Sequence, residues 1–318
     1  MLTFPFHSRA VVVGGGTMGA DVAVVLARAG CKTVIIESQA SRRDTLPAYL
    51  KTGLDTYAEQ AAGLISVVPG LDDVSWQEID LVIECIPERV DIKQALFADL
   101  EKRARPDTLL ASNSSSFPIS AIAEGLATGE RMLGLHFFMP AHLVPLVEVV
   151  MGGASKLENA QVLSDFMRRC GMVPVLVKKD LPGFLANRLQ HALSREAFDM
   201  IDQGIASPED VDAAVRFGFG FRFLAAGPVM QRDHAGIEVH CAAAATMYPT
   251  LNNSPLPARA LSDRVAAGRL GMKTGGGFYD WTPEKIAAER KRYDDLLKAG
   301  LKLLANELPP IQSEANHD

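Results

Sequence analysis

The sequence predicts an α/β protein: an N-terminal Rossmann domain with a doubly wound, mainly parallel sheet, followed by a mainly α-helical domain. Residues 1–180 alternate β-branched apolar runs with helical patterns, as parallel βαβ units do. A glycine-rich segment, residues 14–19, joins the first of these runs to the first helical pattern. From Phe184 onward, apolar residues recur at helical spacing instead. We therefore expect a Rossmann domain over 1–180 and a helical domain over 181–318.

Seven apolar runs are the expected strands, and their near-continuous hydrophobicity is typical of strands covered on both faces. They are residues 9–15, 32–38, 80–88, 107–116, 131–138, 146–152 and 173–179. In the second domain, Ser207 followed by Pro208 predicts the N-terminus of a helix. Residues 282–304 predict an amphipathic helix with a charged outer face.

The composition, with 48% hydrophobic and 22% charged residues in a chain of 318, is that of a globular protein. A net charge of -6 and the lack of a basic run argue against nucleic acid and membranes as partners. Nothing at the N-terminus resembles a secretory signal, and no apolar stretch approaches the roughly 20 residues that span a bilayer. The four cysteines form no CxxC pair, so we expect buried, reduced thiols, a cytoplasmic location and no metal site. They are Cys31, Cys85, Cys170 and Cys241.

The glycine-rich segment has the spacing GxGxxG and lies between a strand and a helix, the context that makes this pattern specific for dinucleotides. The residues expected to contact the cofactor are Gly14, Gly16, Thr17, Met18 and Gly19. Gly14 allows the tight turn, Gly16 lets the backbone approach the pyrophosphate, and Gly19 lets the helix pack close to the strand. The helix N-terminus then faces the phosphate charge.

The choice between NAD and NADP depends on Glu37, which ends the second strand 18 residues after Gly19. A carboxylate there binds the ribose hydroxyls and repels a 2′-phosphate. Arg42 and Arg43 follow closely and could instead accept a 2′-phosphate, but they are expected on the next helix. The sequence therefore favours NAD.

A candidate acid–base pair consists of His136, at the end of a predicted strand, and Glu148 on the next strand. Histidine can accept an alcohol proton near neutral pH, and a carboxylate on its other nitrogen would fix the tautomer and stabilise the imidazolium. Taken alone, a histidine at such a position is more often a hydrogen-bonded structural residue. His142 is a rival candidate, but it lies between two prolines and is expected to be solvent-exposed.

Together with the glycine fingerprint, a series of ordered motifs resembles the L-3-hydroxyacyl-CoA dehydrogenase family over about residues 8–281. These motifs are residues 84–88 with Lys93, residues 112–116, the spacing from His136 to Glu148, residues 182–184 with Asn187 and Arg188, and residues 271–279. The resemblance implies that His136 is the base and Glu148 its partner in the oxidation of a hydroxyl group. It also implies that Ser115 and Asn187 hold the substrate oxygen.

The resemblance extends the expected contacts with NAD to four further residues. These are Glu88, Lys93, Asn113 and Lys273. It also implies a homodimer, because the helical second domain resembles one that dimerises in the family, and the family's main activity belongs to fatty acid metabolism.

The substrate class is left open by three departures from the family pattern. Met139 stands where the family usually has asparagine, and the stretch between Glu37 and Glu84, which contacts CoA in the family through a helical insertion, is shorter here. Residues 218–222 resemble relatives acting on free hydroxy acids, such as carnitine and gulonate dehydrogenases. Arg222 would then bind a carboxylate, or else make a structural salt bridge. The substrate is therefore an acyl-CoA thioester or a free hydroxy acid; a noncatalytic NAD-binding structural protein is the alternative of another class.

Overall fold

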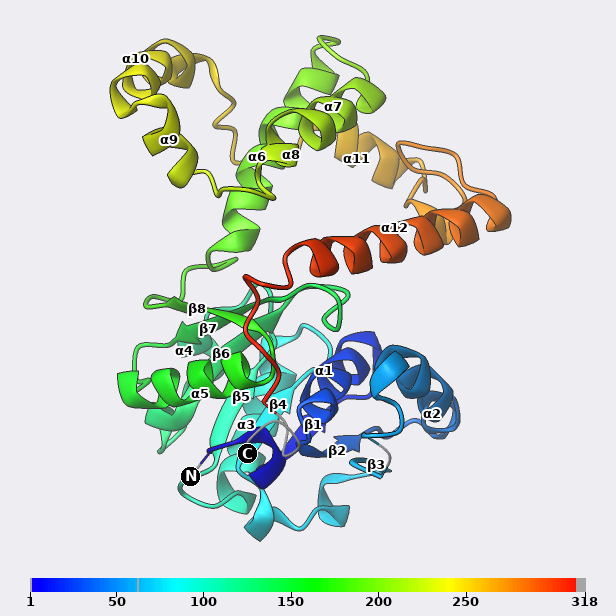
Figure 1. The fold of residues 1–318 in the computed structure, drawn as a ribbon, viewed down its shortest axis with the longest axis vertical. Coiled ribbons are helices and arrows are strands. Elements are labelled where there is room, and N and C mark those ends of the chain that lie inside the picture. The colour runs from blue at the N-terminus through cyan, green and yellow to red at the C-terminus, as the bar shows by residue number, and fades with distance from the viewer. Residues whose placement is uncertain (1, 62, 313–318) are drawn as a thin grey trace. The chain divides into compact units, whose positions relative to one another are not determined.

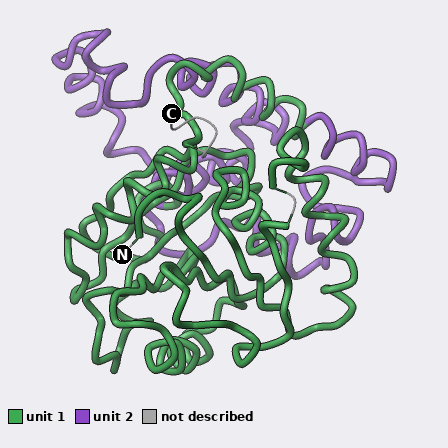
Figure 2. Tube along the Cα trace, turned by 60° about the horizontal axis from the view of Figure 1, so that its bottom comes forward, with its two compact units in different colours: residues 1–187, 293–318 green, residues 188–292 purple. Residues whose placement is uncertain are grey.

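The computed structural model of the protein describes residues 2–61 and 63–312. The chain divides into two compact units, one formed by residues 1–187 with 293–318 and the other by residues 188–292 (Figure 2). The C-terminal segment therefore groups with the sheet, whereas the sequence pattern assigned it to the helical domain. Its contacts explain the difference: Ile311 bridges to Cys170 in the first unit. Periodicity alone cannot reveal a contact over such a sequence separation.

The described residues of the first unit form an eight-stranded sheet with the strand order β3-β2-β1-β4-β5-β6-β7-β8 (Figure 1). The strands are β1 Arg9–Val13, β2 Lys32–Ile36, β3 Ile65–Val68, β4 Leu81–Glu84, β5 Leu109–Ser112, β6 Met132–Phe137, β7 Leu146–Met151 and β8 Val173–Val177. Neighbouring strands run parallel except β6 and β7, which are antiparallel. This topology confirms the predicted Rossmann class, whose strand order is 3-2-1-4-5-6.

Strand β3 was absent from the sequence prediction. It has four residues, pairs with β2 from Thr33–Ile65 to Ile36–Val68, and lies at the edge of the sheet. Its sequence, ISVV, is short and is interrupted by Ser66, so it lacks the longer apolar run that identified the seven other strands.

Helices cover both faces of the sheet and bury two separate apolar clusters. The helices of this unit are α1 Thr17–Arg28, α2 Ala40–Leu54, α3 Val90–Arg103, α4 Ile119–Ile122 and α5 Leu157–Arg169. Leu26 of α1, Leu50 of α2 and Phe166 of α5 belong to one cluster. Phe97 of α3 and Ile119 of α4 belong to the other. Short 3₁₀ helices are η1 Pro5–His7, η2 Asp55–Tyr57, η3 Leu71–Asp73, η4 Trp76–Glu78 and η5 Gly129–Arg131.

The second unit is helical, as predicted. Its elements are most of α6 Ala186–Asp202, then α7 Pro208–Ala214, the π-helical η6 Val215–Phe219, α8 Gly220–Arg222, α9 Met230–Ala235, α10 Ile237–Met247, η7 Tyr248–Thr250, α11 Arg259–Ala266, η8 Met272–Thr274 and the start of α12 Pro283–Leu303. The predicted cap of α7 is confirmed, since Ser207 Oγ accepts a hydrogen bond of 3.1 Å from the Asp210 amide.

The cysteine prediction is correct only in part. The four thiols are free, and Cys31 and Cys170 are buried, but Cys85 is half-buried and Cys241 is exposed. Cys241 lies on α10, a helix without buried residues, so an apolar surrounding in sequence did not mean a buried position. In the described ranges, no helix combines the length and the apolarity needed to cross a membrane.

Candidate active site

Two glycines of the turn after β1 are required by the protein itself. Gly14 has a φ of 106°, and a Cβ there would lie 2.7 Å from the carbonyl oxygen of Cys85. At Gly19, a Cβ would lie only 1.8 Å from the carbonyl oxygen of Gly14. Both positions therefore exclude any side chain, which keeps α1 close against the strand.

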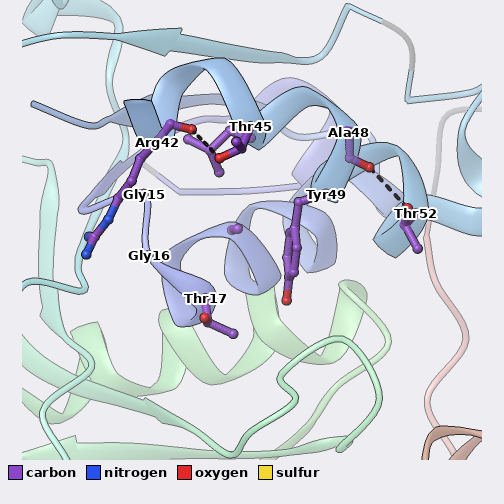
Figure 3. A pocket seen from close by; sticks show the side chains of 10 residues that line it. Gly15, Gly16, Thr17, Arg42, Thr45, Ala48, Tyr49 and Thr52 are labelled. Carbon is purple, nitrogen blue, oxygen red and sulfur yellow. Dashed lines mark hydrogen bonds between the residues drawn. The ribbon is translucent and has the colours of Figure 1, made fainter. Parts of the chain in front are cut away.

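Gly16 has a different reason to be glycine. Its φ of -68° is open to any residue, and the nearest atom to an added Cβ, Nη1 of Arg42, is 4.0 Å away. The open space lies at the N-terminus of α1, where backbone N–H groups favour an anion. Beside it is a cavity of about 560 Å³ lined by Gly15, Gly16 and Thr17 and by residues of α2 (Figure 3). The turn thus leaves room for the pyrophosphate of NAD.

The other two residues of the fingerprint face different surroundings. Thr17 is exposed at the cavity, whereas Met18 is partly buried and packs against the apolar core beneath the sheet. The side chain of Met18 therefore supports the helix, and only its backbone is available to a phosphate.

Glu37 is held at the end of β2 beside the glycine turn. Its carboxylate accepts hydrogen bonds from the Gly15 amide at 3.1 Å and from the Gln39 amide at 2.8 Å, and Nη1 of Arg42 lies 3.8 Å away. Arg43 is engaged elsewhere, donating to the carbonyls of Glu37 and Ser38. A fixed carboxylate here suits the ribose hydroxyls of NAD and opposes an added phosphate.

His136 and Glu148 are brought together by the antiparallel pairing of β6 and β7, in which they are direct partners. Nδ1 of His136 lies 2.7 Å from Oε2 of Glu148, and the residues are 4% and 0% exposed. The second carboxylate oxygen accepts from the Leu185 and Ala186 amides at 3.0 and 2.8 Å. Burial raises the pKa of Glu148, but the hydrogen bonds from His136 and these amides outweigh it, so the pKa lies below the usual value.

The imidazole of His136 is held in one orientation. Its ring centroid lies 4.5 Å from that of Phe138 and 5.7 Å from that of Phe184. An ionised carboxylate only accepts hydrogen bonds, so we assign the ring proton to Nδ1. Nε2 then carries the free lone pair that can accept a proton.

The expectation for His142 was wrong. Its side chain is 17% exposed, and its Nδ1 lies 3.0 Å from Oδ1 of Asp21, a carboxylate that is fully buried in α1. The two flanking prolines suggested an exposed turn, but this loop folds back onto α1. His142 contacts Asp21, whereas His136 contacts Glu148.

Ser115 and Asn187 also lie together, with Nδ2 of Asn187 donating to the Ser115 carbonyl at 3.4 Å. The loop that carries Ser115 is held by Glu88, whose Oε1 accepts from the amides of Ser115 and Ser116 at 3.1 Å each and from the Ser114 hydroxyl. Burial raises the pKa of Glu88, but the Ser114 and Ser116 hydroxyls and Lys93 lower it to about 2. Glu88 is therefore ionised and fixes the backbone around Ser115.

Lys93 lies beneath Glu88 and is only 1% exposed. Its ammonium lies 2.6 Å from Oε1 of Glu84 and 3.1 Å from Oε2 of Glu88. Glu84, fully buried, also accepts from the Ser112 hydroxyl at 2.6 Å. The sequence identified Glu88 and Lys93 as candidate site residues. It gave no role to Glu84, which pairs with Lys93, or to Ser112, which donates a hydrogen bond to Glu84.

Of the remaining predicted residues, Asn113 lies in the first unit, whereas Lys273 and Arg222 lie in the second. Asn113 accepts a hydrogen bond of 2.8 Å from the Phe137 amide and so joins the ends of β5 and β6 beside His136. Lys273 and Arg222 belong to the second unit and are exposed, and Lys273 lines a pocket of about 780 Å³ there. Within residues 2–61 and 63–312, no carboxylate lies at ion-pair distance from Arg222, and no cluster of three potential metal ligands occurs.

The fold and site are those of an NAD-dependent dehydrogenase, and comparison with known proteins identifies the family. The profile "3-hydroxyacyl-CoA dehydrogenase, NAD binding domain" matches residues 9–181, and "3-hydroxyacyl-CoA dehydrogenase, C-terminal domain" matches residues 183–281. The chain belongs to the 3-hydroxyacyl-CoA dehydrogenase family. It is an NAD-dependent enzyme acting on a CH–OH group.

Two relatives with different named substrates resemble the chain to a similar degree. The 5-formyl-3-hydroxy-2-methylpyridine 4-carboxylate 5-dehydrogenase of Mesorhizobium japonicum is 33% identical over 291 residues, covering 88% of this chain and 94% of the relative. The 3-hydroxyadipyl-CoA dehydrogenase of Escherichia coli is 35% identical over 317 residues, covering 96% of this chain and 64% of the relative.

Two solved structures have nearly the same sequence identity to this chain but clearly different TM-scores. A crystal structure of a 5-formyl-3-hydroxy-2-methylpyridine 4-carboxylic acid 5-dehydrogenase, described as an NAD⁺-dependent dismutase, has a TM-score of 0.88 at 29% identity and covers 93% of this chain and 98% of its own. A (S)-3-hydroxybutyryl-CoA dehydrogenase from Ralstonia eutropha has a TM-score of 0.70 at 28% identity and covers 86% and 99%.

Proposed function

We propose that this enzyme oxidises the hydroxyl group of a small substrate that carries a free carboxylate, rather than a CoA thioester. The observation that carries the proposal is the chain between β2 and β3, whose described helices are α2 and the short η2. The resemblance to the family implies a longer helical insertion there, which contacts CoA. The higher TM-score to a dehydrogenase named for a pyridine carboxylate supports the same substrate class.

The site residues account for the proton transfer. His136, buried beside Glu148, accepts the hydroxyl proton at Nε2, and the carboxylate stabilises the imidazolium that forms. Ser115 and Asn187 donate hydrogen bonds to the substrate oxygen and stabilise charge that develops there. The glycine turn and Glu37 would hold NAD, which when bound would supply the hydride acceptor. Glu88, which pairs with Lys93, keeps the serine loop in place.

Arg222 is the proposed partner of the substrate carboxylate. Its guanidinium is exposed and has no carboxylate at ion-pair distance among the described residues, so its planar fork is available to a ligand. A bidentate, charge-assisted pair contributes on the order of 2 to 3 kcal/mol to binding.

A substrate panel followed by NADH absorbance tests the proposal. It compares 3-hydroxybutyryl-CoA with free 3-hydroxy acids, carnitine, gulonate and hydroxymethyl-pyridine carboxylates. For the free acid that is turned over, Arg222→Met should raise KM by roughly 30-fold, since 1.4 kcal/mol corresponds to a factor of ten. Lysine at this position should recover only part of the loss. Arg259→Met is the matched control and should leave KM unchanged, because Arg259 is also an exposed arginine of the second unit but does not line the pocket that contains Lys273.

An acyl-CoA thioester is the second candidate, favoured by 35% identity to the 3-hydroxyadipyl-CoA dehydrogenase over nearly the whole chain. A thioester substrate predicts that the CoA ester is turned over far more efficiently than its free acid and that Arg222→Met changes KM little. That result would overturn the free-carboxylate proposal and leave the His136–Glu148 chemistry intact.

We also infer that the enzyme is a homodimer formed through the second unit. Among the described residues 188–292, Ala260 is the only buried apolar residue, whereas Phe217, Val229 and Leu256 are 73%, 80% and 73% exposed. A helical unit with so little core needs a further apolar surface to cover it, and a second copy supplies one. Light scattering should report a dimer, and Phe217→Glu should weaken it. A monomer at micromolar concentration would contradict this.

A further inference from the structure

Asp21 is a charged residue in an otherwise apolar stretch of α1. Its side chain is fully buried, and the neighbouring Val22, Ala23, Val24 and Val25 belong to the core. An ionised carboxylate in such surroundings costs several kcal/mol unless hydrogen-bond donors or opposite charges compensate it. The partners of Asp21 therefore indicate why a carboxylate is present in this helix.

Three groups surround the carboxylate of Asp21. Oδ1 accepts a hydrogen bond of 2.8 Å from the Tyr49 hydroxyl, and Oδ2 accepts one of 3.0 Å from the Ala141 amide. Nδ1 of His142 lies 3.0 Å from Oδ1. Burial and the hydrogen bond to Asp21 raise the pKa of Tyr49, so its hydroxyl remains a donor. Asp21 thus joins α1 to α2 and to the loop between β6 and β7.

That loop connects the two strands of the acid–base pair, His136 on β6 and Glu148 on β7. Within it, Phe138 packs on the His136 ring, and the following residue, Met139, is 63% exposed. A second contact comes from the same helix, since Nη1 of Arg28 donates to the His142 carbonyl at 2.8 Å. Helix α1 therefore holds the loop at two neighbouring residues.

On the cofactor side, the network reaches the cavity beside the glycine turn. Tyr49 projects from α2 into this cavity, which Gly16 and Thr17 also line (Figure 3). One buried carboxylate is thereby in contact with a wall of the cofactor cavity and with the loop next to the catalytic histidine.

We propose that Asp21 is a positioning residue that fixes the β6–β7 loop to the cofactor helix and so keeps His136 and its neighbour Phe138 in the geometry that turnover requires. The catalytic part of this inference rests on the proposed role of His136. The anchoring part rests only on the contacts above. A displacement of about 1 Å in a group near the reacting atoms can lower the rate by roughly 100-fold, so the anchor has a measurable effect on kcat.

Asp21→Asn tests the proposal because it preserves shape but removes the charge and one acceptor. Hydrogen exchange of the peptide covering residues 138–146 should accelerate, and kcat with whichever panel substrate the unmodified enzyme uses should fall roughly 10-fold or more. NADH binding, measured by fluorescence, should stay close to that of the unmodified enzyme. Tyr49→Phe, which removes one of the donors, should produce a smaller change in the same direction.

Thr108→Val is the matched control for a loss of stability alone. Thr108 is fully buried, and its hydroxyl donates to the Ile79 carbonyl at 2.6 Å, away from the loop. This variant should lower the melting temperature while leaving loop exchange and kcat unchanged. If Asp21→Asn behaves like Thr108→Val, or if the loop exchanges faster while kcat is unaffected, the positioning role is refuted. If no panel substrate is oxidised, the proposed function fails, whereas the exchange experiment still reports whether Asp21 anchors the loop.

Discussion

His136 and Glu148 face each other across the antiparallel pair β6–β7, with Nδ1 and Oε2 separated by 2.7 Å. The antiparallel pairing is what makes this contact possible, since directly opposed residues in such a pair have adjacent side chains. Glu148 is fixed further by the Leu185 and Ala186 amides, which precede and begin α6. The sheet therefore orients both residues of the pair, and the segment leading into α6 fixes the Glu148 carboxylate.

Removal of the proposed base should abolish most turnover. His136→Ala should lower kcat by roughly 100-fold or more, while NADH binding measured by fluorescence is nearly unchanged. Glu148→Gln should lower kcat less, because the imidazole remains but loses the carboxylate that stabilises its charged form. If His142→Ala eliminates turnover while His136→Ala does not, the proton acceptor has been assigned to the wrong histidine.

Much of this fold could be predicted because its strands have strong local signals. The apolar runs before Gly14 and Glu37 predicted β1 and β2, and the position of His136 before a turn and a second strand predicted its proximity to Glu148. Strand β3 was not predicted, because its four residues, of which Ser66 is exposed, carry no distinctive pattern and depend on pairing with β2. Such an edge strand is specified by a distant neighbour rather than by its own composition.

The polar groups that support the site could not be predicted for a related reason. In sequence, Asp21 is an isolated acid in an apolar helix, and its partner Ala141 lies 120 positions away. The buried ion pair of Lys93 with Glu84 was equally hidden, because a lysine on an amphipathic helix is usually solvated. Only the tertiary structure reveals which buried charges compensate one another.

The cofactor preference should depend on Glu37. The unmodified enzyme should use NAD much better than NADP, because the carboxylate held by the Gly15 and Gln39 amides repels a 2′-phosphate. Glu37→Ala should narrow the gap, since Arg42, 3.8 Å from the carboxylate, becomes free to pair with that phosphate. The measurement is kcat/KM for each cofactor. Equal efficiencies in the unmodified enzyme would contradict the assignment.

Lys93 should be essential for stability as well as for the site. Lys93→Met leaves the buried Glu84 carboxylate without its cation, which should reduce the free energy of unfolding by about 3–5 kcal/mol. Urea denaturation followed by circular dichroism measures this change. The double variant Lys93→Met with Glu84→Gln should recover part of the loss, because the uncompensated charge is gone. Lys32→Met, at an exposed position of β2, should have little effect. Equal losses in the two lysine variants would contradict the importance of the buried pair.

Glu88 predicts a distinct dependence of stability on pH. In the folded protein, the Ser114 and Ser116 hydroxyls and Lys93 outweigh the effect of burial and lower the pKa of Glu88 from 4.5 to about 2. A carboxyl group with a lowered folded-state pKa stabilises the fold at pH values above its unfolded-state pKa, and this contribution disappears as the pH falls towards the folded-state value. The stabilisation by Glu88 should therefore be complete above about pH 5 and decline between pH 4.5 and about 2.

Glu88→Gln isolates this contribution, because the amide keeps the shape but does not titrate. The free energy of unfolding should be higher for the unmodified enzyme at pH 6, and the difference between the two proteins should shrink as the pH is lowered through this window. Urea titrations at a series of pH values measure it. The size of the effect is moderated by solvent, because the side chain of Glu88 is 35% exposed. A difference that stays constant from pH 6 to pH 3 would show that the Glu88 carboxylate gains no stability from its contacts with the serine loop and Lys93, and that the loop carrying Ser115 is held by its backbone alone.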